Sequence, residues 1–274
     1  CALPIFGADE VRTEPEVCRL YSSDVYSAGE TALAVVSPRS VEAVAAATGA
    51  LTRAGVAIAP RGGGMSYTGG YIPARRDTVV MDLARLDRIV EIAADDMYVT
   101  VEAGVTWRQL YRALQPLGLR TPFFGTFSGA RATVGGGLSN GALFLGTARH
   151  GTAADALLGL EVVLADGSLL RTGQLAFAAA QRPFYRTCGP DLSGLFAHDA
   201  GTLGLKVRAT LKLMRAPAHE EYGSFVFEDM GSAARALSEV ARTGAAAVAP
   251  RAPASGYDIG IRMAGSGACD AEIA

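Results

Sequence analysis

The sequence predicts an α+β fold that contains more than one sheet. Three observations lead to this prediction. A β-α-β pattern covers residues 32–59, a longer run of strands with turn signals covers residues 78–213, and the pattern restarts after Ala216-Pro217. The chain has 274 residues, of which 50% are hydrophobic, so it can bury a substantial core without a disulfide scaffold.

The β-α-β unit is defined by its cap residues. The apolar run Ala32–Val36 predicts a strand, and Ser40 is a suitable N-cap for a helix that begins at Val41. The apolar face of this helix is formed by Val41, Val44, Ala45, Thr48 and Leu51. Gly55 is placed to end the helix, and Val56–Ala59 predicts the second strand.

Further strands and one helix follow. Alternating valine and isoleucine predict strands at Thr78–Leu83, Arg88–Ile92 and Tyr98–Glu102. Thr106 and Gln109 have the spacing of a capping box for a helix that Gly118 closes. Asp166-Gly167 predicts a hairpin between two strands, residues 191–196 predict a short helical turn, and Leu205–Leu213 predicts another strand, whose Val207, Ala209 and Leu211 belong to the core.

The pattern that restarts after Ala216-Pro217 predicts the beginning of a second domain. Strands are expected at Ser224–Phe227 and Ala245–Ala249, with a helix at Ser232–Arg242 between them. No element is predicted in the last twenty-five residues, which are rich in Gly, Pro, Ala and Ser. We therefore expect this second domain to be incomplete.

Two glycine-rich segments, Pro60–Gly70 and Thr133–Gly141, carry the functional signal. Each is expected to follow an apolar β-like run and to form a loop whose backbone tolerates positive φ and close approach. One such segment alone is more typical of a tight turn. Two of them predict that peptide N–H groups from separate stretches converge on an anion such as a pyrophosphate.

Composition excludes several other classes of function. The net charge is -2 and the only lysines are Lys206 and Lys212, so the chain has no basic run for nucleic acid. The four cysteines form no C-x-x-C pair, so neither a zinc site nor a disulfide framework is predicted, and we expect a cytoplasmic protein. No apolar stretch is long enough to span a bilayer, and residues 1–6 do not resemble a signal peptide. The first residue is not methionine, so we expect the chain to begin inside a longer gene product.

Five motifs together resemble a known family. They are P-R-G-G-G-M-S-Y-T-G-G from Pro60, V-E-A-G-V-T-W-R-Q-L from Val101, A-T-V-G-G-G-L-S-N from Ala132, H-G-T-A-A-D-A-L-L-G-L-E-V-V-L-A-D-G from His150 and D-A-G-T-L-G-L-K-V-R-A-T-L from Asp199. Their order and spacing resemble the FAD-binding domain of the p-cresol methylhydroxylase / vanillyl-alcohol oxidase (PCMH-type) superfamily, especially its D-lactate dehydrogenase and glycolate oxidase flavin-subunit branch.

The resemblance implies a two-subdomain FAD-binding PCMH-type fold, with a small β-α-β subdomain and a larger mixed-sheet subdomain. Residues 1–25 would be an N-terminal extension and residues 26–217 the FAD-binding domain. Residues 218–274 would begin an α+β cap domain and stop before its end. In the family the cap supplies most substrate contacts and the acid–base group, so no catalytic residue is assigned in this chain.

The resemblance also implies the cofactor contacts. Backbone amides around the FAD pyrophosphate would come from Arg61, Gly62, Gly63, Gly64, Met65 and Ser66, and the flanking Pro60 and Tyr67 would also contact the cofactor. Thr133, Val134, Gly135, Gly136 and Asn140 would lie along the flavin and pyrophosphate, with Pro122 and Thr126 on the segment leading there. Arg149, His150 and Gly151 would lie near the isoalloxazine, and Val162, Gly201, Gly204 and Leu205 near the adenine. For His150 a surface or hydrogen-bonded structural role is favoured over catalysis, because a lone histidine is not a catalytic constellation.

We expect FAD to bind non-covalently. Some relatives attach FAD through a histidine after the glycine triplet, and this chain has Met65 there. Attachment through a cysteine near Arg149 is excluded as well, because no cysteine lies between Cys18 and Cys188.

The resemblance implies an FAD-dependent oxidoreductase that moves a hydride from a hydroxyl-bearing carbon, as in a 2-hydroxy acid such as D-lactate or glycolate, to FAD. The expected partners are a small-molecule substrate and an electron acceptor, which is oxygen, a quinone or a protein. The alternative is a flavin-binding module or subunit that needs a partner chain or a missing C-terminal half. A nicotinamide-binding Rossmann protein ranks low because neither segment has the G-x-G-x-x-G pattern opening a helix. The cell-wall reductase of an enolpyruvyl sugar nucleotide ranks below the leading hypothesis because its loop chemistry differs.

Overall fold

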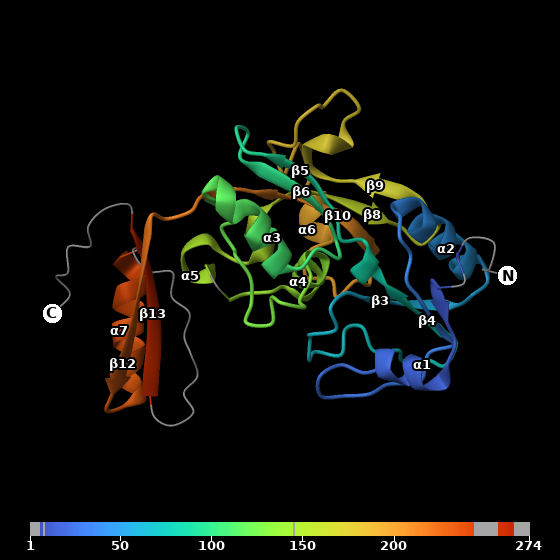
Figure 1. Cartoon of the computed structure of the whole chain (residues 1–274), viewed down its shortest axis with the longest axis horizontal. Coiled ribbons are helices and arrows are strands. Elements are labelled where there is room, and N and C mark those ends of the chain that lie inside the picture. The colour runs from blue at the N-terminus through green and yellow to red at the C-terminus, as the bar shows by residue number, and fades with distance from the viewer. Residues whose placement is uncertain (1–5, 8, 145, 244–256, 266–274) are drawn as a thin grey trace.

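The computed structural model describes residues 6–7, 9–144, 146–243 and 257–265, and Figure 1 shows how the elements are arranged. Four strands form the first sheet in the order β1-β2-β4-β3. Their bounds are Val11–Arg12, Ala34–Val36, Thr78–Asp82 and Ala57–Arg61 in that order. β2 and β3 run parallel to β4, whereas β1 pairs antiparallel with β2. The first sheet thus contains the expected β-α-β unit and one strand from the N-terminal segment.

Helices cover both faces of the first sheet. α2 (Val41–Arg53) begins at Ser40, whose side chain accepts a hydrogen bond from Ala43 N at 3.1 Å, and it is followed by Gly55 at φ 72°. The α2 side packs with Val79 and Met81 of β4, and α1 (Pro15–Tyr21) packs on the side of Val80. Because successive strand residues face opposite sides, these two clusters lie on the two faces of one sheet.

Five antiparallel strands form the second sheet in the order β5-β6-β10-β8-β9. Their bounds are Ile89–Ala93, Tyr98–Glu102, Leu205–Lys212, Leu157–Val163 and Leu169–Arg171 in that order. One apolar face of β10 belongs to two cores. Leu205 and Val207 pack with the first sheet, and Ala209 and Leu211 pack with the helices of the second. β10 therefore contributes to both cores and joins the two sheets.

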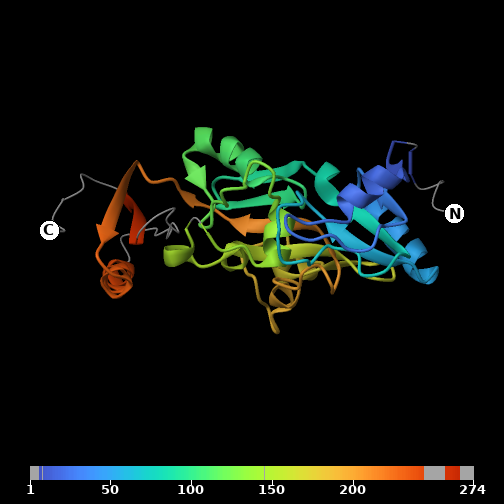
Figure 2. The same cartoon turned by 90° about the horizontal axis from the view of Figure 1, so that it is seen from below.

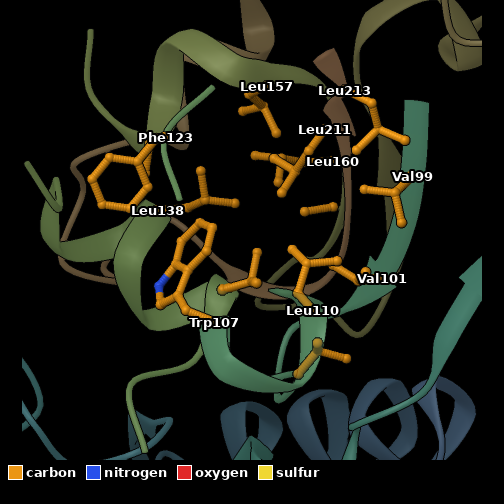
Figure 3. Packing of buried hydrophobic residues seen from close by; sticks show 14 of the residues in the cluster. Val99, Val101, Trp107, Leu110, Phe123, Leu138, Leu157, Leu160, Leu211 and Leu213 are labelled. Atoms are coloured by element: carbon orange, nitrogen blue, oxygen red, sulfur yellow. The ribbon is translucent and has the colours of Figure 1, made fainter. Parts of the chain in front are cut away.

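The larger core lies between the second sheet and two helices, α3 (Trp107–Leu114) and α4 (Val134–Asn140). Figure 3 shows Trp107, Leu110 and Leu138 turned toward the strand residues, among them Leu157, Leu160 and Leu211. Trp107 and Phe123 make an edge-to-face contact with ring centroids 5.0 Å apart. This packing fixes α4, and with it the second glycine-rich segment.

The structure differs from the sequence prediction at the second glycine-rich segment and at the start of α3. The second glycine-rich segment is the helix α4, capped by Thr133, and no strand precedes it directly. Its small residues let it pack tightly, since a Cβ on Gly135 would lie 2.6 Å from that of Ala103. At the start of α3, the backbone N–H of Gln109 donates to the Thr106 hydroxyl, as the capping box requires. The side-chain amide of Gln109 does not return to Thr106 and instead donates to Asp87 O at 2.8 Å, so only half of the capping box forms.

The remaining elements are short or lie at the C-terminal end. β7 (Leu119–Arg120) pairs with β11 (Met214–Arg215), and β12 (His219–Phe227) pairs with β13 (Tyr257–Gly265) beside α7 (Met230–Thr243). Single turns of helix are α5 (Thr147–His150), α6 (Leu192–Leu195) and the 3₁₀ segments Leu83–Arg85, Gln115–Leu117, Ala153–Ala156 and Gly173–Ala176. Figures 1 and 2 both show α7, β12 and β13 at the end of the molecule opposite α2.

The C-terminal region corrects another expectation. β13 was not predicted, because its sequence is rich in small residues, yet it pairs with β12 along its whole length from Tyr257 to Gly265. The strand expected at Ala245–Ala249 lies outside the described residues. None of the helices in the described ranges combines the length and apolar character that crossing a membrane requires.

We predict that Gly135→Ala lowers the free energy of unfolding by about 1–3 kcal/mol, because the added methyl group would overlap Ala103. Gly136→Ala is the matched control in the same helix, since its Cβ would meet only the Thr133 hydroxyl, at 3.0 Å. Urea unfolding of both variants checks this. Equal midpoints for the two would contradict the packing argument.

Candidate functional site

A cleft of about 730 Å³ lies where segments far apart in the sequence meet. It is lined by the loop after β3, the segment before α4, α4 itself, the residues after α4, and the turn before β10. Its volume falls in the usual range for small-molecule sites, about 300–1,000 Å³. The cleft therefore gathers most of the segments that the sequence singled out.

The first glycine-rich loop supplies free backbone donors. Within the described residues, no hydrogen bond uses the amides of Gly63, Gly64, Met65, Ser66 and Tyr67. The loop reaches the second segment so closely that a Cβ on Gly63 would lie 1.9 Å from Arg131 O. Five consecutive unpaired N–H groups beside a cleft are a suitable cradle for an anion.

The Arg61 side chain holds this loop in place. Its guanidinium carbon lies 5.0 Å from the ring centroid of Tyr21 and 4.8 Å from that of Tyr71. Its Nη1 donates to Tyr21 O at 3.1 Å and to Ser23 O at 2.8 Å. Because these contacts engage the guanidinium, Arg61 supports the loop and leaves anion binding to the backbone amides.

The N-terminal segment contributes to the cleft, which sequence reasoning missed. Val25 and Tyr26 line it, and Tyr26 makes an edge contact with Tyr67 at 5.7 Å between centroids. Asp24 ties the segment to the loop by accepting from Gly69 N at 2.9 Å. No local signal identifies this role, because the partners are more than forty residues apart in the sequence.

Helix α4 lines the cleft, but its first backbone N–H groups are already hydrogen-bonded within the protein. Val134 N donates to Val105 O, Gly135 N to Ala103 O, and Gly136 N to the Thr133 hydroxyl. The expectation that free amides of both segments converge is therefore wrong for the second segment, because it is a capped helix. Gly135, Gly136 and Gly137 line the cleft, and the absence of a Cβ at Gly135 and Gly137 allows the helix to pack on Ala103 and Trp107.

Three polar side chains connect the two segments at the end of α4. Asn140 Oδ1 accepts from Ser66 Oγ at 3.1 Å and from Thr68 Oγ1 at 2.8 Å. The two hydroxyl oxygens lie 3.0 Å apart. These bonds place Ser66 and Asn140, both expected cofactor contacts, on one side of the cleft.

Most of the expected contacts line the cleft, and some do not. Those that line it are Pro60, Arg61, Gly62, Gly63, Gly64, Met65, Ser66, Tyr67, Thr126, Thr133, Gly135, Gly136, Asn140, Gly201 and Gly204. Those outside its lining are Pro122, Val134, Arg149, His150, Gly151, Val162 and Leu205. The side chains of Val134, Val162 and Leu205 are buried in the two main cores, so any contact they make with a ligand is through the backbone.

An apolar end of the cleft was also missed. Phe127 and Phe144 line it and make an edge-to-face contact at 4.3 Å, and Leu143 and Trp107 line it as well. Phe127 is 73% exposed, which is unusual for so large an apolar side chain. An aromatic ring system in the cleft would cover this surface.

Arg149 and His150 lie on α5, outside the cleft lining. Within the described residues, His150 Nε2 is buried without a hydrogen-bond partner. Burial lowers the pKa of His150, and the charges of Arg120 and Arg149 lower this pKa further. The imidazole is therefore neutral near pH 7, and the role of His150 stays a prediction.

We predict that Arg61→Met lowers the free energy of unfolding by about 2 kcal/mol, because two charged hydrogen bonds to carbonyl groups are lost. Arg76→Met is the control, since Arg76 is exposed and its salt bridge with Glu30 should contribute less than about 1 kcal/mol. Urea unfolding of both variants measures the difference. An equal decrease in the free energy of unfolding for both variants would show that the contacts of Arg61 stabilise the fold no more than an exposed salt bridge does.

We predict that His150 makes stability fall as the pH drops below its ordinary pKa of 6.5. Below this pH the imidazole of His150 is protonated in the unfolded chain but stays neutral in the folded chain, and this difference in proton binding favours unfolding. The contribution is absent above pH 6.5 and grows as the solution becomes more acidic. His150→Gln should therefore lose less stability than the unchanged chain between pH 8 and 5.5, and a histidine NMR titration that placed the pKa of His150 at or above 6.5 would contradict this.

Comparisons with known proteins agree with this geometry. Residues 32–173 match the family described as FAD binding domain. A Danio rerio protein described as probable mitochondrial D-lactate dehydrogenase is 33% identical over 210 residues, which are 77% of this chain and 41% of that protein. The glycolate oxidase subunit GlcD of Bacillus subtilis is 31% identical over 208 residues, 76% of this chain and 42% of that protein. The chain thus spans about two fifths of the length of these curated relatives.

The fold is shared with a protein of known structure. The crystal structure of p-cresol methylhydroxylase with substrate bound superposes with a TM-score of 0.78 at 20% identity, covering 96% of this chain and 59% of that one. This likeness confirms the PCMH-type fold that the motifs implied, and the match of residues 32–173 includes the first glycine-rich loop and α4, which both line the cleft. The chain belongs to the FAD binding domain family.

Proposed function

We propose that the chain is the FAD-binding part of an oxidoreductase that moves a hydride from the hydroxyl-bearing carbon of a small 2-hydroxy acid, such as D-lactate or glycolate, to FAD. The observation that carries the proposal is the row of unpaired amides from Gly63 to Tyr67 beside the cleft. The names of the D-lactate dehydrogenase and glycolate oxidase relatives support the substrate class.

The residues of the cleft fit FAD. The amides of residues 63–67 and the Ser66 hydroxyl would hold the pyrophosphate, and the apolar surface of Phe127, Leu143 and Phe144 would hold a ring system. Bound FAD would supply the redox chemistry, while the chain binds and orients it. We propose non-covalent binding, since no histidine or cysteine is among the described residues that line the cleft.

The described lining of the cleft offers few acid–base groups. It has no aspartate, glutamate or histidine, Lys206 is paired with Asp199, and Tyr71 OH donates to Ser66 O at 3.1 Å, which leaves the hydroxyl groups of Tyr26 and Tyr67. A group that takes the hydroxyl proton of the substrate would have to lie within hydrogen-bond reach of it. This observation favours the second candidate, a flavin-binding module or subunit whose substrate site is completed by a partner chain or by further C-terminal residues.

Several features of the whole protein remain proposals. We propose that residues 26–217 form the FAD-binding domain, that residues 1–25 precede it, and that residues 218–274 begin a cap. The electron acceptor would be oxygen, a quinone or a protein, and a partner subunit belongs to the second candidate. A cytoplasmic location stays a prediction, because the Danio rerio relative is described as mitochondrial.

The proposal predicts that the purified 274-residue chain binds FAD and that acid precipitation releases the flavin intact. D-lactate or glycolate should then bleach the flavin absorbance without oxygen, whereas propionate, which lacks the hydroxyl group, should not. A chain that binds no FAD would sink the proposal. Binding without bleaching, together with bleaching by a form extended at the C-terminus or mixed with a partner, would establish the second candidate.

A further inference from the structure

A buried ion pair at the edge of the cleft joins the turn before β10 to the start of that strand. Lys206 Nζ donates to Asp199 Oδ1 at 2.6 Å, and the two side chains are only 2% and 3% exposed. Burying two charges is costly unless further hydrogen bonds satisfy them. Asp199 meets this condition, because it also accepts from Gly201 N at 2.8 Å and from Leu203 N at 3.3 Å.

The backbone around Asp199 is held in an unfavourable conformation. His198 has φ 59° and Ala200 has φ 53°, so a residue with a Cβ adopts the left-handed region on each side of Asp199. Such conformations persist only where the surroundings hold them. The bonds from Asp199 to Gly201, Leu203 and Lys206 provide such a constraint.

This turn lies between the two glycine-rich segments. His198 N donates to Leu138 O and Ala200 N donates to Ser139 O, each at 2.9 Å, which attaches the turn to α4. On its other side it meets the first loop. A Cβ on Gly70 would lie 3.1 Å from that of Ala200, and a Cβ on Gly201 would lie 2.5 Å from Pro60 Cγ.

We propose that Asp199 and Lys206 are positioning residues that hold the turn 198–204 in the shape that completes the FAD cleft. Ala200, Gly201, Gly204 and Lys206 all line the cleft, so a change in this turn moves its wall. The Lys206 ammonium acts through Asp199, to which it is bound. This inference rests on the proposed binding of FAD in the cleft.

The test measures FAD affinity in the 274-residue chain by flavin absorbance, with Lys206→Met and Asp199→Asn. Each variant should raise the dissociation constant for FAD at least tenfold. Both changes break the same ion pair. The double variant should therefore bind FAD no more weakly than the single variant with the higher dissociation constant.

Glu102→Gln is the matched control. Glu102 is 1% exposed and pairs with Arg88 at 2.7 Å, but neither residue lines the cleft. The control should lose stability while its dissociation constant for FAD stays within twofold of the unchanged chain. A merely structural role of Lys206 would give the same pattern as this control.

Folded Lys206→Met or Asp199→Asn protein that binds FAD within twofold of the unchanged chain would overturn the inference and leave the proposed function standing. Failure of the unchanged chain to bind FAD would overturn both. If neither variant folds, hydrogen exchange on the unchanged chain decides. Addition of FAD should slow exchange at Gly201 and Leu203, and unaltered exchange there would overturn the inference.

Discussion

The structure of the site depends on one close backbone contact, between Gly63 and the carbonyl group of Arg131. No side chain fits there, since a Cβ would lie 1.9 Å from that oxygen. The contact brings a loop of the first sheet against the segment that caps α4, and α4 is fixed by its packing on Trp107 above the second sheet. Glycine at position 63 therefore allows the loop after β3 and the segment before α4 to meet at the cleft.

A loop with unpaired amides needs support from outside, because its own backbone makes few bonds. Here that support comes from two other segments, residues 21–24 and the end of α4. Arg61 is bound by the carbonyl groups of Tyr21 and Ser23, Asp24 holds Gly69, and Asn140 holds Ser66. The donors of the first loop are thus kept available for a ligand while their positions are fixed, which reduces the ordering that binding would otherwise require.

The elements that the sequence predicted well depend on local chemistry. The caps at Ser40 and Gly55 and the hairpin at Asp166-Gly167 use bonds and backbone angles within a few residues, and the structure confirms all of them. The failures concern contacts that are distant along the chain. Three glycines after Thr133 are typical of a loop, but packing on Trp107 makes them a helix. Likewise Tyr26 reaches the cleft, and β13 forms, only through partners elsewhere in the chain.

The charged side chains of the cleft indicate which of its groups are available to a ligand. Its two cationic side chains, Arg61 and Lys206, are both engaged, one by carbonyl groups and aromatic rings and the other by Asp199. Carboxylates and imidazoles are missing from the described lining. A site that both bound and oxidised a 2-hydroxy acid would need a cation free for the carboxylate and a base for the hydroxyl group. Among the described lining residues, the groups left for a ligand are backbone amides, hydroxyl groups and apolar rings, a set that suits the binding and orienting of a cofactor.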